Sequence, residues 1–457
     1  MISKKSDLNK VREIINKSGR KYFFVCNDLI HALSISGVIE KPVIISYDES
    51  PLADALRSSG AEIFLMNETN NDFGELKTTN NLISHDFTRD VISNYHGEKN
   101  LLVFKSSHIV EEYADKLNLN LLAPSAKIAR GIENKVTFYN ELMNEDLNLI
   151  PGEIIKVSEN TEYSKLADKY GAEFVMQASK GFGGNKTFHI RNKSDLTAIK
   201  DIYNKRSMRL TKYIPGRTLT INGCVTSIGT MVRPPFFQLT GIAELTSNVM
   251  GACGNDFDIS SLDTKLVCDV MKSTKRIGDI ISKKGFSGIF GVDYIVNGDT
   301  AYFVECNPRF VTSLTVFTQL ETKNEDIPLV AYHILEHLGM IDTLKNIPKD
   351  NPNFNNFSGN QLIMHNLSGV EKSVSSDMDC GVYTFRNGEI LFLRSGCLID
   401  DLRSEDEFLL IPKPKGTVIN GGIECARIFT YDKALSDGEL NLTTKEIVEK
   451  VYCRLFE

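Results

Sequence analysis

Apolar positions in the first part of the chain form short runs, separated by segments with helical spacing. The runs KYFFVC, PVIISY, AEIFLM and LLVFK have the length and the β-branched and aromatic content of strands. Segments such as SPLADALRSSG, between two of these runs, have the pattern of a helix instead. Strands that alternate with helices typically build a parallel sheet covered by helices. We therefore predict an α/β domain over residues 1–115.

The pattern changes twice in the remainder of the chain. From about residue 120 to 345 strands and helices mix less regularly, and SLDTKLVCDVMKSTKRIGDIISKKG predicts a long helix that stops at Gly285. The segment NIPKDNPNFNNFSGN is rich in Pro and Asn, which is typical of a linker. The last hundred residues are rich in strands, and GVYTFRNGEILFL predicts a hairpin with Asn387 and Gly388 at its turn.

Composition and charge narrow the classes of function. The chain has 457 residues, of which 42% are hydrophobic and 24% charged, and its net charge is −7. An acidic balance argues against a general nucleic-acid binder, and no apolar run approaches the roughly 20 residues that cross a bilayer. The nine cysteines show no CxxC spacing, which favours free thiols in a reducing compartment. We expect a cytoplasmic protein that binds neither membranes nor nucleic acid.

The segment GVDYIVNGDTAYFVECNPRF carries the clearest chemistry. Two strands joined at Asn297-Gly298-Asp299 would place Asp293 opposite Glu305. Asn307 points the same way and adds a neutral oxygen, and oxygen ligands of this kind suit Mg²⁺. Arg309 supplies positive charge for a phosphate or carboxylate. A hairpin with a surface ion pair between Glu305 and Arg309 is the simpler alternative.

Three further segments are weaker when each is taken alone. SKGFGGNKTF, residues 179–188, lies between two strands, and its three glycines can present backbone N–H groups to phosphates; a flexible hairpin is the alternative. Lys135 lies early in a predicted helix and is within reach of a phosphate, although a solvated lysine is commoner. TKYIPGRTLTING predicts a strand, a turn and a second strand.

The order and spacing of these segments are more specific than any one of them. Over roughly residues 120–320 the chain resembles the ATP-grasp superfamily of carboxylate–amine and carboxylate–thiol ligases, with E-x-N-P-R as the specific element. The resemblance implies a mixed α/β and α+β fold in three parts. They are a Rossmann-like domain over residues 1–115, an ATP-grasp domain over 116–345 with a lid at about 153–210, and a β-rich domain over 346–457.

The resemblance also implies roles for individual residues. Asp293, Glu305 and Asn307 are the implied Mg²⁺ ligands, with Mn²⁺ as an alternative ion, and Arg309 is the implied catalytic residue at the acyl phosphate or the reacting carboxylate. The implied ATP-binding residues are Lys135, Gln177, Lys180, Gly181, Gly183, Gly184, Lys186, Lys212, Tyr213, Ile214 and Gln238. Arg427, in GGIECARI, is the second implied catalytic residue, and a structural pair with Glu424 is its alternative.

The chain departs from the family pattern at two of these positions. Gln177 stands where a second ATP-binding lysine is usual, so Lys180 or Lys186 would have to substitute for it. Thr211 stands where the linker usually has a glutamate before its aromatic residue. Both differences indicate a subgroup with its own nucleotide pocket.

The implied activity is ATP-dependent joining of a small carboxylate to an amine through an acyl phosphate. ELTSNVMGACGNDFD, residues 244–258, is a candidate substrate loop whose Asp256 and Asp258 could hold an amino group, which favours an amino-acid or peptide ligase. A biotin-carboxylase-like or purine-pathway enzyme and a non-catalytic ATP-binding module are the alternatives. His333 and His337 lie four apart, but we interpret them as an ordinary helix face. Relatives are often homodimers, so a homodimer is expected.

Overall fold

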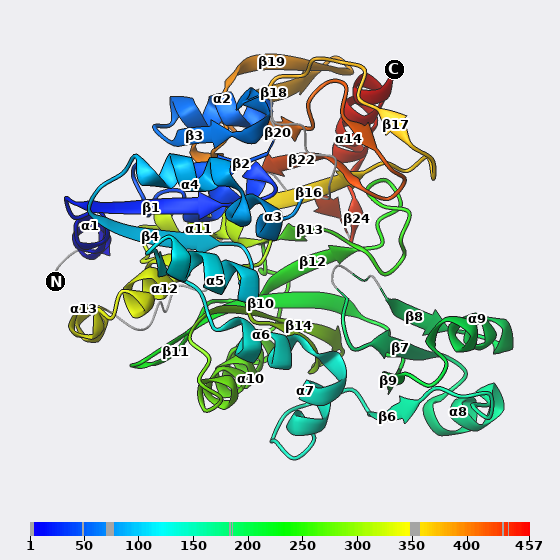
Figure 1. Ribbon diagram of the computed structural model, residues 1–457. Coiled ribbons are helices and arrows are strands. Elements are labelled where there is room, and N and C mark those ends of the chain that lie inside the picture. The colour runs from blue at the N-terminus through cyan, green and yellow to red at the C-terminus, as the bar shows by residue number, and fades with distance from the viewer. Residues whose placement is uncertain are drawn as a thin grey trace.

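The computed structural model describes residues 4–47, 50–69, 77–181, 184, 186–347, 357–431, 434–436 and 438–457. Three larger sheets organise this part of the chain (Figure 1). The predicted linker lies largely outside the described residues, as does Gly183.

The N-terminal sheet is parallel, as the strand–helix alternation predicts. Its order is β3-β2-β1-β4-β5, and both faces are buried because helices cover them. The strands are β1 (Arg20–Val25), β2 (Val43–Ser46), β3 (Glu62–Leu65), β4 (Glu98–Val103) and β5 (Asn120–Leu121). The helices, with η for the 3₁₀ type, are α1 (Lys4–Ile15), η1 (Leu29–Ile35), α2 (Pro51–Ser58), η2 (Met66–Thr69), α3 (Thr79–Ser84), α4 (Asp86–Ser93) and α5 (His108–Lys116).

A four-stranded antiparallel sheet with its own core extends from the rest of the molecule (Figure 1). Its order is β6-β9-β7-β8, and we call it the lid. The lid consists of β6 (Gly152–Lys156), α8 (Tyr163–Tyr170), β7 (Phe174–Ala178), β8 (Thr187–Ile190), α9 (Lys193–Tyr203) and β9 (Ser207–Lys212). The glycine-rich segment connects β7 to β8, which confirms the predicted strand–loop–strand arrangement.

The large sheet has 11 strands in the order β15-β14-β10-β12-β13-β16-β22-β20-β18-β19, with β11 beside β10. Its first strands are β10 (Arg217–Thr226), β11 (Gly229–Val232), β12 (Phe236–Thr240), β13 (Ala252–Asp256), β14 (Gly288–Asn297) and β15 (Thr300–Asn307). The later strands are β16 (Asn360–His365), β18 (Gly381–Arg386), β19 (Glu389–Ser395), β20 (Glu407–Pro412) and β22 (Glu424–Thr430). Pairing of β13 with β16 therefore joins the central and C-terminal parts of the chain in one sheet.

Helices cover both faces of the large sheet. The predicted long helix is α10, and it packs on β10 and β11, while α11 and α12 lie on the opposite face. The helices are α6 (Ala126–Glu133), α7 (Lys135–Leu142), α10 (Thr264–Ser282), α11 (Leu314–Lys323), α12 (Leu329–His337), α13 (Ile341–Asn346) and α14 (Leu442–Phe456). The remaining elements are β17 (Lys372–Ser373), η3 (Ile399–Asp401), β21 (Val418–Ile419), β23 (Leu435–Ser436) and β24 (Glu439–Leu440).

Two predicted local features have different outcomes. The hairpin of β18 and β19 is confirmed, with Asn387 and Gly388 at φ 52° and 77° in its turn. The predicted loop over residues 244–258 is partly wrong, because 252–256 form strand β13 inside the sheet. There Gly254 approaches β16 so closely that a Cβ would lie 2.1 Å from the carbonyl oxygen of Gln361.

We predict that Gly254→Ala destabilises the protein by roughly 2–4 kcal/mol, since the added methyl must push two paired strands apart at a positive φ. Gly229→Ala is the matched control, because Gly229 also has a positive φ but nothing lies within 4 Å of the point that its methyl group would occupy. Urea unfolding of both variants measures the difference. Equal destabilisation would show that backbone strain alone, and not strand contact, governs this position.

Candidate functional site

The predicted carboxylate pair is formed by the hairpin of β14 and β15. Asp293 and Glu305 are directly opposite in the ladder, beside a register shift between Asp293 and Tyr294. Thr220 Oγ1, on the neighbouring strand β10, donates to Asp293 Oδ1 at 2.6 Å. Asn307 Nδ2 donates to Asp293 Oδ2 at 3.1 Å and to Glu305 Oε1 at 3.4 Å. The structure thus brings together all three side chains predicted as metal ligands.

Burial and like charge make this pair unfavourable in its fully ionised form. Burial and then the repulsion of Glu305 raise the pKa of Asp293 to about 7. A divalent cation would relieve both effects, and two carboxylates with one amide fit a hydrated Mg²⁺ that completes its shell on phosphates. To act as a ligand, Asn307 would have to turn its amide over, since its oxygen accepts from Arg309 Nη2 at 3.2 Å. Within the described ranges no cluster of three or more His, Cys, Asp or Glu side chains could hold a metal ion.

Lys135 lies against this carboxylate pair. Asn134 separates α6 from α7 and caps α7, with its side chain accepting from the N–H groups of Val136 and Thr137. The side chain of Lys135, 6% exposed, forms an ion pair and hydrogen bond with Glu305. Its backbone N–H donates to Ser179 at the start of the glycine-rich segment, at 3.1 Å. Lys135 therefore links the carboxylate pair to the base of the lid.

Arg309 does not form the surface ion pair with Glu305 that was the simpler alternative. Its Nη1 donates to the carbonyl oxygen of Phe310 at 2.9 Å, and its Nε lies 3.4 Å from Glu133 Oε1. Glu133 Oε2 also forms an ion pair with Lys105 Nζ, at 2.5 Å. Burial alone would raise the pKa of Glu133, but Lys105 and Arg309 outweigh it, so the pKa is lowered. Arg309 is thus held beside the carboxylates by an acid that remains ionised.

Arg209 is a site residue that the sequence analysis missed. It lies on β9 of the lid, is 2% exposed, and donates from Nη1 to the carbonyl oxygen of Val304 at 2.6 Å. It lines a small cavity together with Lys135 and Glu305. Its Nε is buried without a partner, and burial lowers its pKa to about 10 although Glu305 acts in the opposite direction. An arginine inside the apolar run SMRLTK was the available signal.

Gln177 lies directly opposite Arg209, in the ladder of β7 and β9. Gln177 is 4% exposed, donates from Nε2 to Thr187 at 3.1 Å, and has a buried Oε1 without a partner. The position where the family usually has a lysine is therefore adjacent to a buried arginine. This arrangement favours Arg209, more than Lys180 or Lys186, as the substitute cation, because both of those lysines are exposed.

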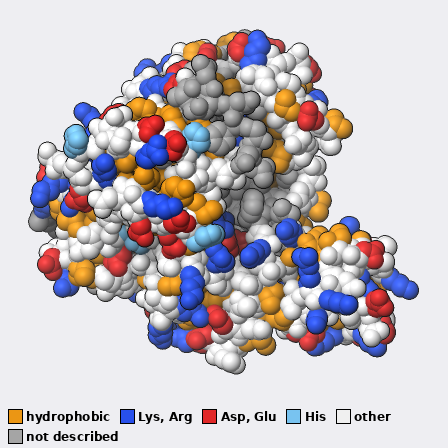
Figure 2. Space-filling model, viewed as in Figure 1, with side chains coloured by type: hydrophobic (Ala, Val, Ile, Leu, Met, Phe, Trp, Pro, Cys, Tyr) orange, Lys and Arg blue, Asp and Glu red, His pale blue; other side chains and the backbone are white. Residues whose placement is uncertain are grey.

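The glycine-rich segment contacts the segment that precedes β13. Gly184, at φ 79°, is so close to the backbone of Met250 that a Cβ would lie 2.0 Å from the Met250 carbonyl oxygen. Gly181 is partly buried in the same segment. The described glycines thus lie where the lid approaches the predicted substrate loop, and Figure 2 shows Lys and Arg side chains gathered where the lid meets the rest of the molecule.

The linker after the lid has the predicted form of a strand end and a turn. Lys212 is exposed, whereas Tyr213 and Ile214 are partly buried. Tyr213 stacks on His189 of β8, with the ring centroids 4.2 Å apart and the planes 18° from parallel. A role for this linker in adenine binding remains a prediction.

One face of the large sheet carries several of the predicted residues. Residues directly opposite in antiparallel strands, and every second residue along a strand, share a face. The registers therefore place the following polar side chains on the face covered by α11: Asp293, Thr220, Gln238, Asn255, Gln361 and Arg427. Gln361 Oε1 accepts from Thr315 of α11 at 2.8 Å. Gln238 and Arg427 thus share a surface with the carboxylate pair, although Arg427 lies several strands away.

Arg427 forms the pair with Glu424 that was its structural alternative. Its Nε and Nη2 donate to the two carboxylate oxygens at 2.7 and 2.8 Å. Asp256 and Asp258 accept backbone N–H groups within their own segment, from Asp258 at 3.0 Å and Ser260 at 2.8 Å. Their predicted role in holding an amino group stays a prediction.

The helix-face interpretation of the two histidines agrees with their packing. His333 Nδ1 accepts from the backbone N–H of Ile289 at 3.1 Å, and its Nε2 lies 2.9 Å from the carbonyl oxygen of Leu122. Burial lowers the pKa of His337 to about 4. Both rings pack over Gly288 in the sheet.

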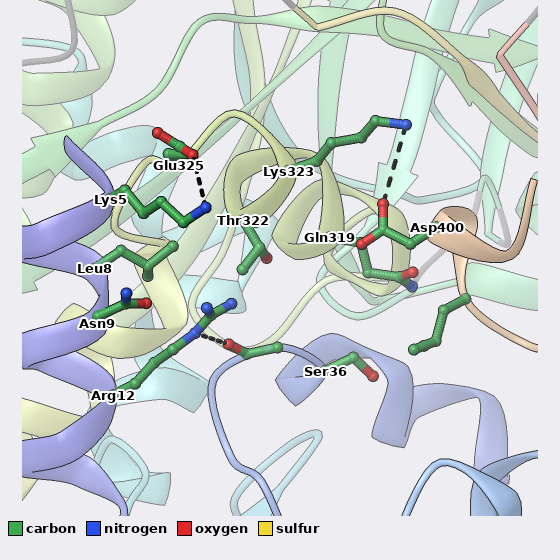
Figure 3. Close-up of a pocket in the computed structure, with 12 residues that line it drawn as sticks. Lys5, Leu8, Asn9, Arg12, Ser36, Gln319, Thr322, Lys323, Glu325 and Asp400 are labelled. Atoms are coloured by element: carbon green, nitrogen blue, oxygen red, sulfur yellow. Dashed lines mark hydrogen bonds and ion pairs between the residues drawn. The ribbon is translucent and has the colours of Figure 1, made fainter. Parts of the chain in front are cut away.

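A separate cavity lies between α1, the two residues after η1, and α11 (Figure 3). Four of its five charged residues are matched in pairs: Lys5 lies 3.8 Å from Glu325, and Lys323 lies 4.0 Å from Asp400. Arg12 Nε donates to the carbonyl oxygen of Gly37 at 2.6 Å. This cavity contains none of the predicted site residues.

Comparison with known proteins identifies the domain that contains the carboxylate pair. Residues 132–313 match the family model of the ATP-grasp domain. The arginine-specific large chain of carbamoyl phosphate synthase from Halalkalibacterium halodurans is 21% identical over 226 residues, which cover 48% of this chain and 20% of that protein. The chain thus spans about a fifth of the length of this relative.

Solved structures match nearly the whole chain. The biotin carboxylase domain dimer of Hydrogenobacter thermophilus 2-oxoglutarate carboxylase, in complex with MgADP, ADP and bicarbonate, has a TM-score of 0.57 at 12% identity, covering 90% of this chain and 86% of that one. N5-carboxyaminoimidazole synthase from Aspergillus clavatus, in complex with ADP and 5-aminoimidazole ribonucleotide, has a TM-score of 0.55 at 10% identity, covering 94% of this chain and 99% of that one. Identities this low establish the fold alone.

The chain therefore contains an ATP-grasp domain and has the ATP-grasp fold, as the sequence resemblance implied. None of the helices in the described ranges is long and apolar enough to cross a membrane.

We predict that Mg²⁺ affinity in the presence of ADP falls as the pH drops below about 7, by roughly tenfold per pH unit. The sign follows from the raised pKa of Asp293: below it the carboxyl holds a proton that the ion must displace. Calorimetric titrations at pH 6, 7 and 8 test this, with Asp293→Asn as the control that should lose the added dependence. The same slope in both proteins would contradict the assignment.

Proposed function

We propose that this chain is an ATP-dependent ligase that joins a carboxylate to an amine through an acyl phosphate and releases ADP and phosphate. One observation carries the proposal: two facing carboxylates are surrounded by Lys135, Arg209 and Arg309 in an ATP-grasp domain. Such a site can bind a nucleoside triphosphate and neutralise the charge of a transferred phosphoryl group.

Each side chain has a distinct task in this proposal. Asp293, Glu305 and Asn307 would hold Mg²⁺, which supplies charge neutralisation at the phosphates. Lys135 and Arg209, which line one small cavity with Glu305, bind phosphate oxygens in this proposal. Arg309 orients the carboxylate that receives the phosphoryl group, and Glu133 keeps Arg309 in place.

The lid would exclude water, because an acyl phosphate is readily hydrolysed. In this proposal the described residues of the glycine-rich segment, Lys180, Gly181, Gly184 and Lys186, cover the phosphates. Lys212, Tyr213 and Ile214 contact the adenine, and Gln177 and Gln238 face the nucleotide site. Gly183 belongs to the same proposed segment.

The substrate class is an amino acid or a small peptide. The predicted units, 1–115, 116–345 and 346–457, are part of the proposal, with β5 belonging to the N-terminal sheet. A biotin-carboxylase-like or purine-pathway activity is the second candidate, because structures of both kinds match the chain over nearly its whole length. A cytoplasmic location and a homodimer remain predictions of the sequence.

The proposal predicts phosphate release that depends on a second substrate. The protein is incubated with ATP, Mg²⁺ and pooled amino acids and small amines, and the mixture is analysed by mass spectrometry. We expect ADP, phosphate and a condensed product, all lost in Glu305→Gln. AMP and pyrophosphate would contradict the acyl-phosphate route, and bicarbonate-dependent turnover would favour the second candidate.

Arg209→Met should weaken ATP binding by about ten- to hundredfold, the effect expected for losing a hydrogen bond to a charged group. Arg209→Lys should recover part of the loss. Arg206→Met, a change at an exposed arginine near the start of the same strand, is the matched control. Binding of a fluorescent ATP analogue measures all three variants, and equal affinities for the Arg209→Met and control proteins would remove Arg209 from the site.

A further inference from the structure

A second group of charged residues lies between the N-terminal sheet and the C-terminal strands. Asp28 and His31 come from the segment after β1, Lys413 follows β20, and Glu424 and Arg427 belong to β22. Asp28 Oδ2 accepts from Lys413 Nζ at 2.7 Å, and Arg427 is bound to Glu424 through two nitrogens. We call these five residues the junction cluster.

The junction cluster is electrically balanced but has unmet hydrogen-bonding groups. Its two acids match its two cations, and Arg427 is 3% exposed. Arg427 Nη1 and His31 Nδ1 are nevertheless buried without partners. A buried polar group without a partner is costly, so evolution usually removes it or uses it to bind something.

Another buried ion pair of the same chain shows what a purely structural pair looks like. Arg233 is bound to Glu321 at 2.7 Å and also donates to the carbonyl oxygen of Ile327 at 2.5 Å. None of its nitrogens is among the buried atoms without partners in the described part of the chain. Arg427 differs: Nε and Nη2 donate to Glu424, but its third nitrogen, Nη1, has no acceptor.

His31 of the junction cluster and Arg309 both contact the ring of Phe104. His31 stacks on Phe104, with centroids 3.9 Å apart and planes 18° from parallel. The guanidinium carbon of Arg309 lies 5.3 Å from the centroid of the same ring. Arg427 also shares the α11 face of the sheet with Asp293, several strands away, so a small molecule at the cluster would approach Arg309 through Phe104.

The two unpaired atoms are complementary in chemical type. Arg427 Nη1 is a donor that carries positive charge, and therefore suits a carboxylate. Burial lowers the pKa of His31 to about 4, so the imidazole is neutral at pH 7 and one of its nitrogens is an acceptor. One cationic donor and one neutral acceptor match the carboxylate and the amino group of a single small molecule.

We propose that the junction cluster binds an α-amino acid, the amine substrate of the ligase, with its carboxylate on Arg427 and its amino group toward His31. This assignment rests on the proposed function and adds the position at which the amino acid binds. The balanced charge of the cluster favours a zwitterion over a simple anion, which would leave a net negative charge there. The amino group would then face Arg309, where the acyl phosphate is to form.

The first test measures binding without turnover. The full chain, saturated with MgADP, is titrated separately with each of the twenty standard L-α-amino acids, and any that binds is compared with its decarboxylated amine. We expect at least one amino acid to bind, and its amine to bind about tenfold more weakly or worse, since the contact with Arg427 is lost. Binding of none of the twenty, or equal binding of acid and amine, would overturn the proposal.

The second test uses variants chosen to preserve the fold. Arg427→Lys keeps the charge beside Glu424 but loses the forked guanidinium, and His31→Phe keeps a ring on Phe104 but loses the acceptor. Each should raise the dissociation constant or KM of the amino acid about tenfold or more, while MgADP affinity stays within about twofold. Arg233→Lys, at the buried arginine–glutamate pair that leaves no buried nitrogen without a partner in the described part of the chain, is the matched control and should change neither.

The two tests separate this proposal from the ligase assignment. Amino-acid binding that is weakened by Arg427→Lys, without any condensed product, would contradict the ligase but keep the site. Ligation with unchanged amino-acid KM in both variants would contradict the site and keep the ligase.

Discussion

The repulsion between Asp293 and Glu305 is the constraint around which the rest of the structure is arranged. Two carboxylates that face each other in a buried ladder are unfavourable unless cations and donors meet them. The fold supplies these partners from separate elements: Thr220 from β10, Lys135 from the junction of α6 and α7, and Arg209 from the lid. Arg209 of the lid and Lys135 of α7 thus bring positive charge to the same carboxylate, Glu305.

The continuous sheet extends this constraint to the C-terminal strands. A sheet that bends away between the domains would point Asp293 and Arg427 in unrelated directions. Pairing of β13 with β16, which requires Gly254, places both on the face covered by α11. The segment after β1 then packs over the same region, because η1 contacts α11. The segment after β1, the hairpin that carries Asp293 and the strand that carries Arg427 are distant in sequence, and all three thus lie on the face of the sheet that α11 covers.

Sequence patterns predicted the elements that depend on local chemistry. The β18–β19 turn follows from Asn387-Gly388, and the hairpin of β14 and β15 follows from its turn at Asn297-Gly298-Asp299. The opposition of Asp293 and Glu305 also needs the register shift beside Asp293, because a regular ladder would pair Asp293 with Val304. Strand β13 was missed because its short sequence, ACGND, has weak strand propensity and is stabilised by its neighbours in the sheet. Arg209 and three members of the junction cluster, Asp28, His31 and Lys413, were missed for a different reason, although Arg427 and its pair with Glu424 were named from the sequence. Their contacts join residues far apart in sequence, such as Asp28 and Lys413, and no local pattern records such a meeting.

Three buried arginines differ in how completely their hydrogen bonds are satisfied. Arg233 is nearly as buried as Arg209 and Arg427, and its contacts with Glu321 and Ile327 leave it no buried nitrogen without a partner in the described ranges. Arg209 and Arg427 each keep one such nitrogen, and each lies on a surface shared with the predicted site. Burial of a guanidinium alone does not indicate function, because a well-paired arginine can be wholly structural. Recognition of an anionic group requires a rigid cation with an available hydrogen-bond donor. A guanidinium that one partner holds in place, and that keeps one N–H without an acceptor, meets both requirements.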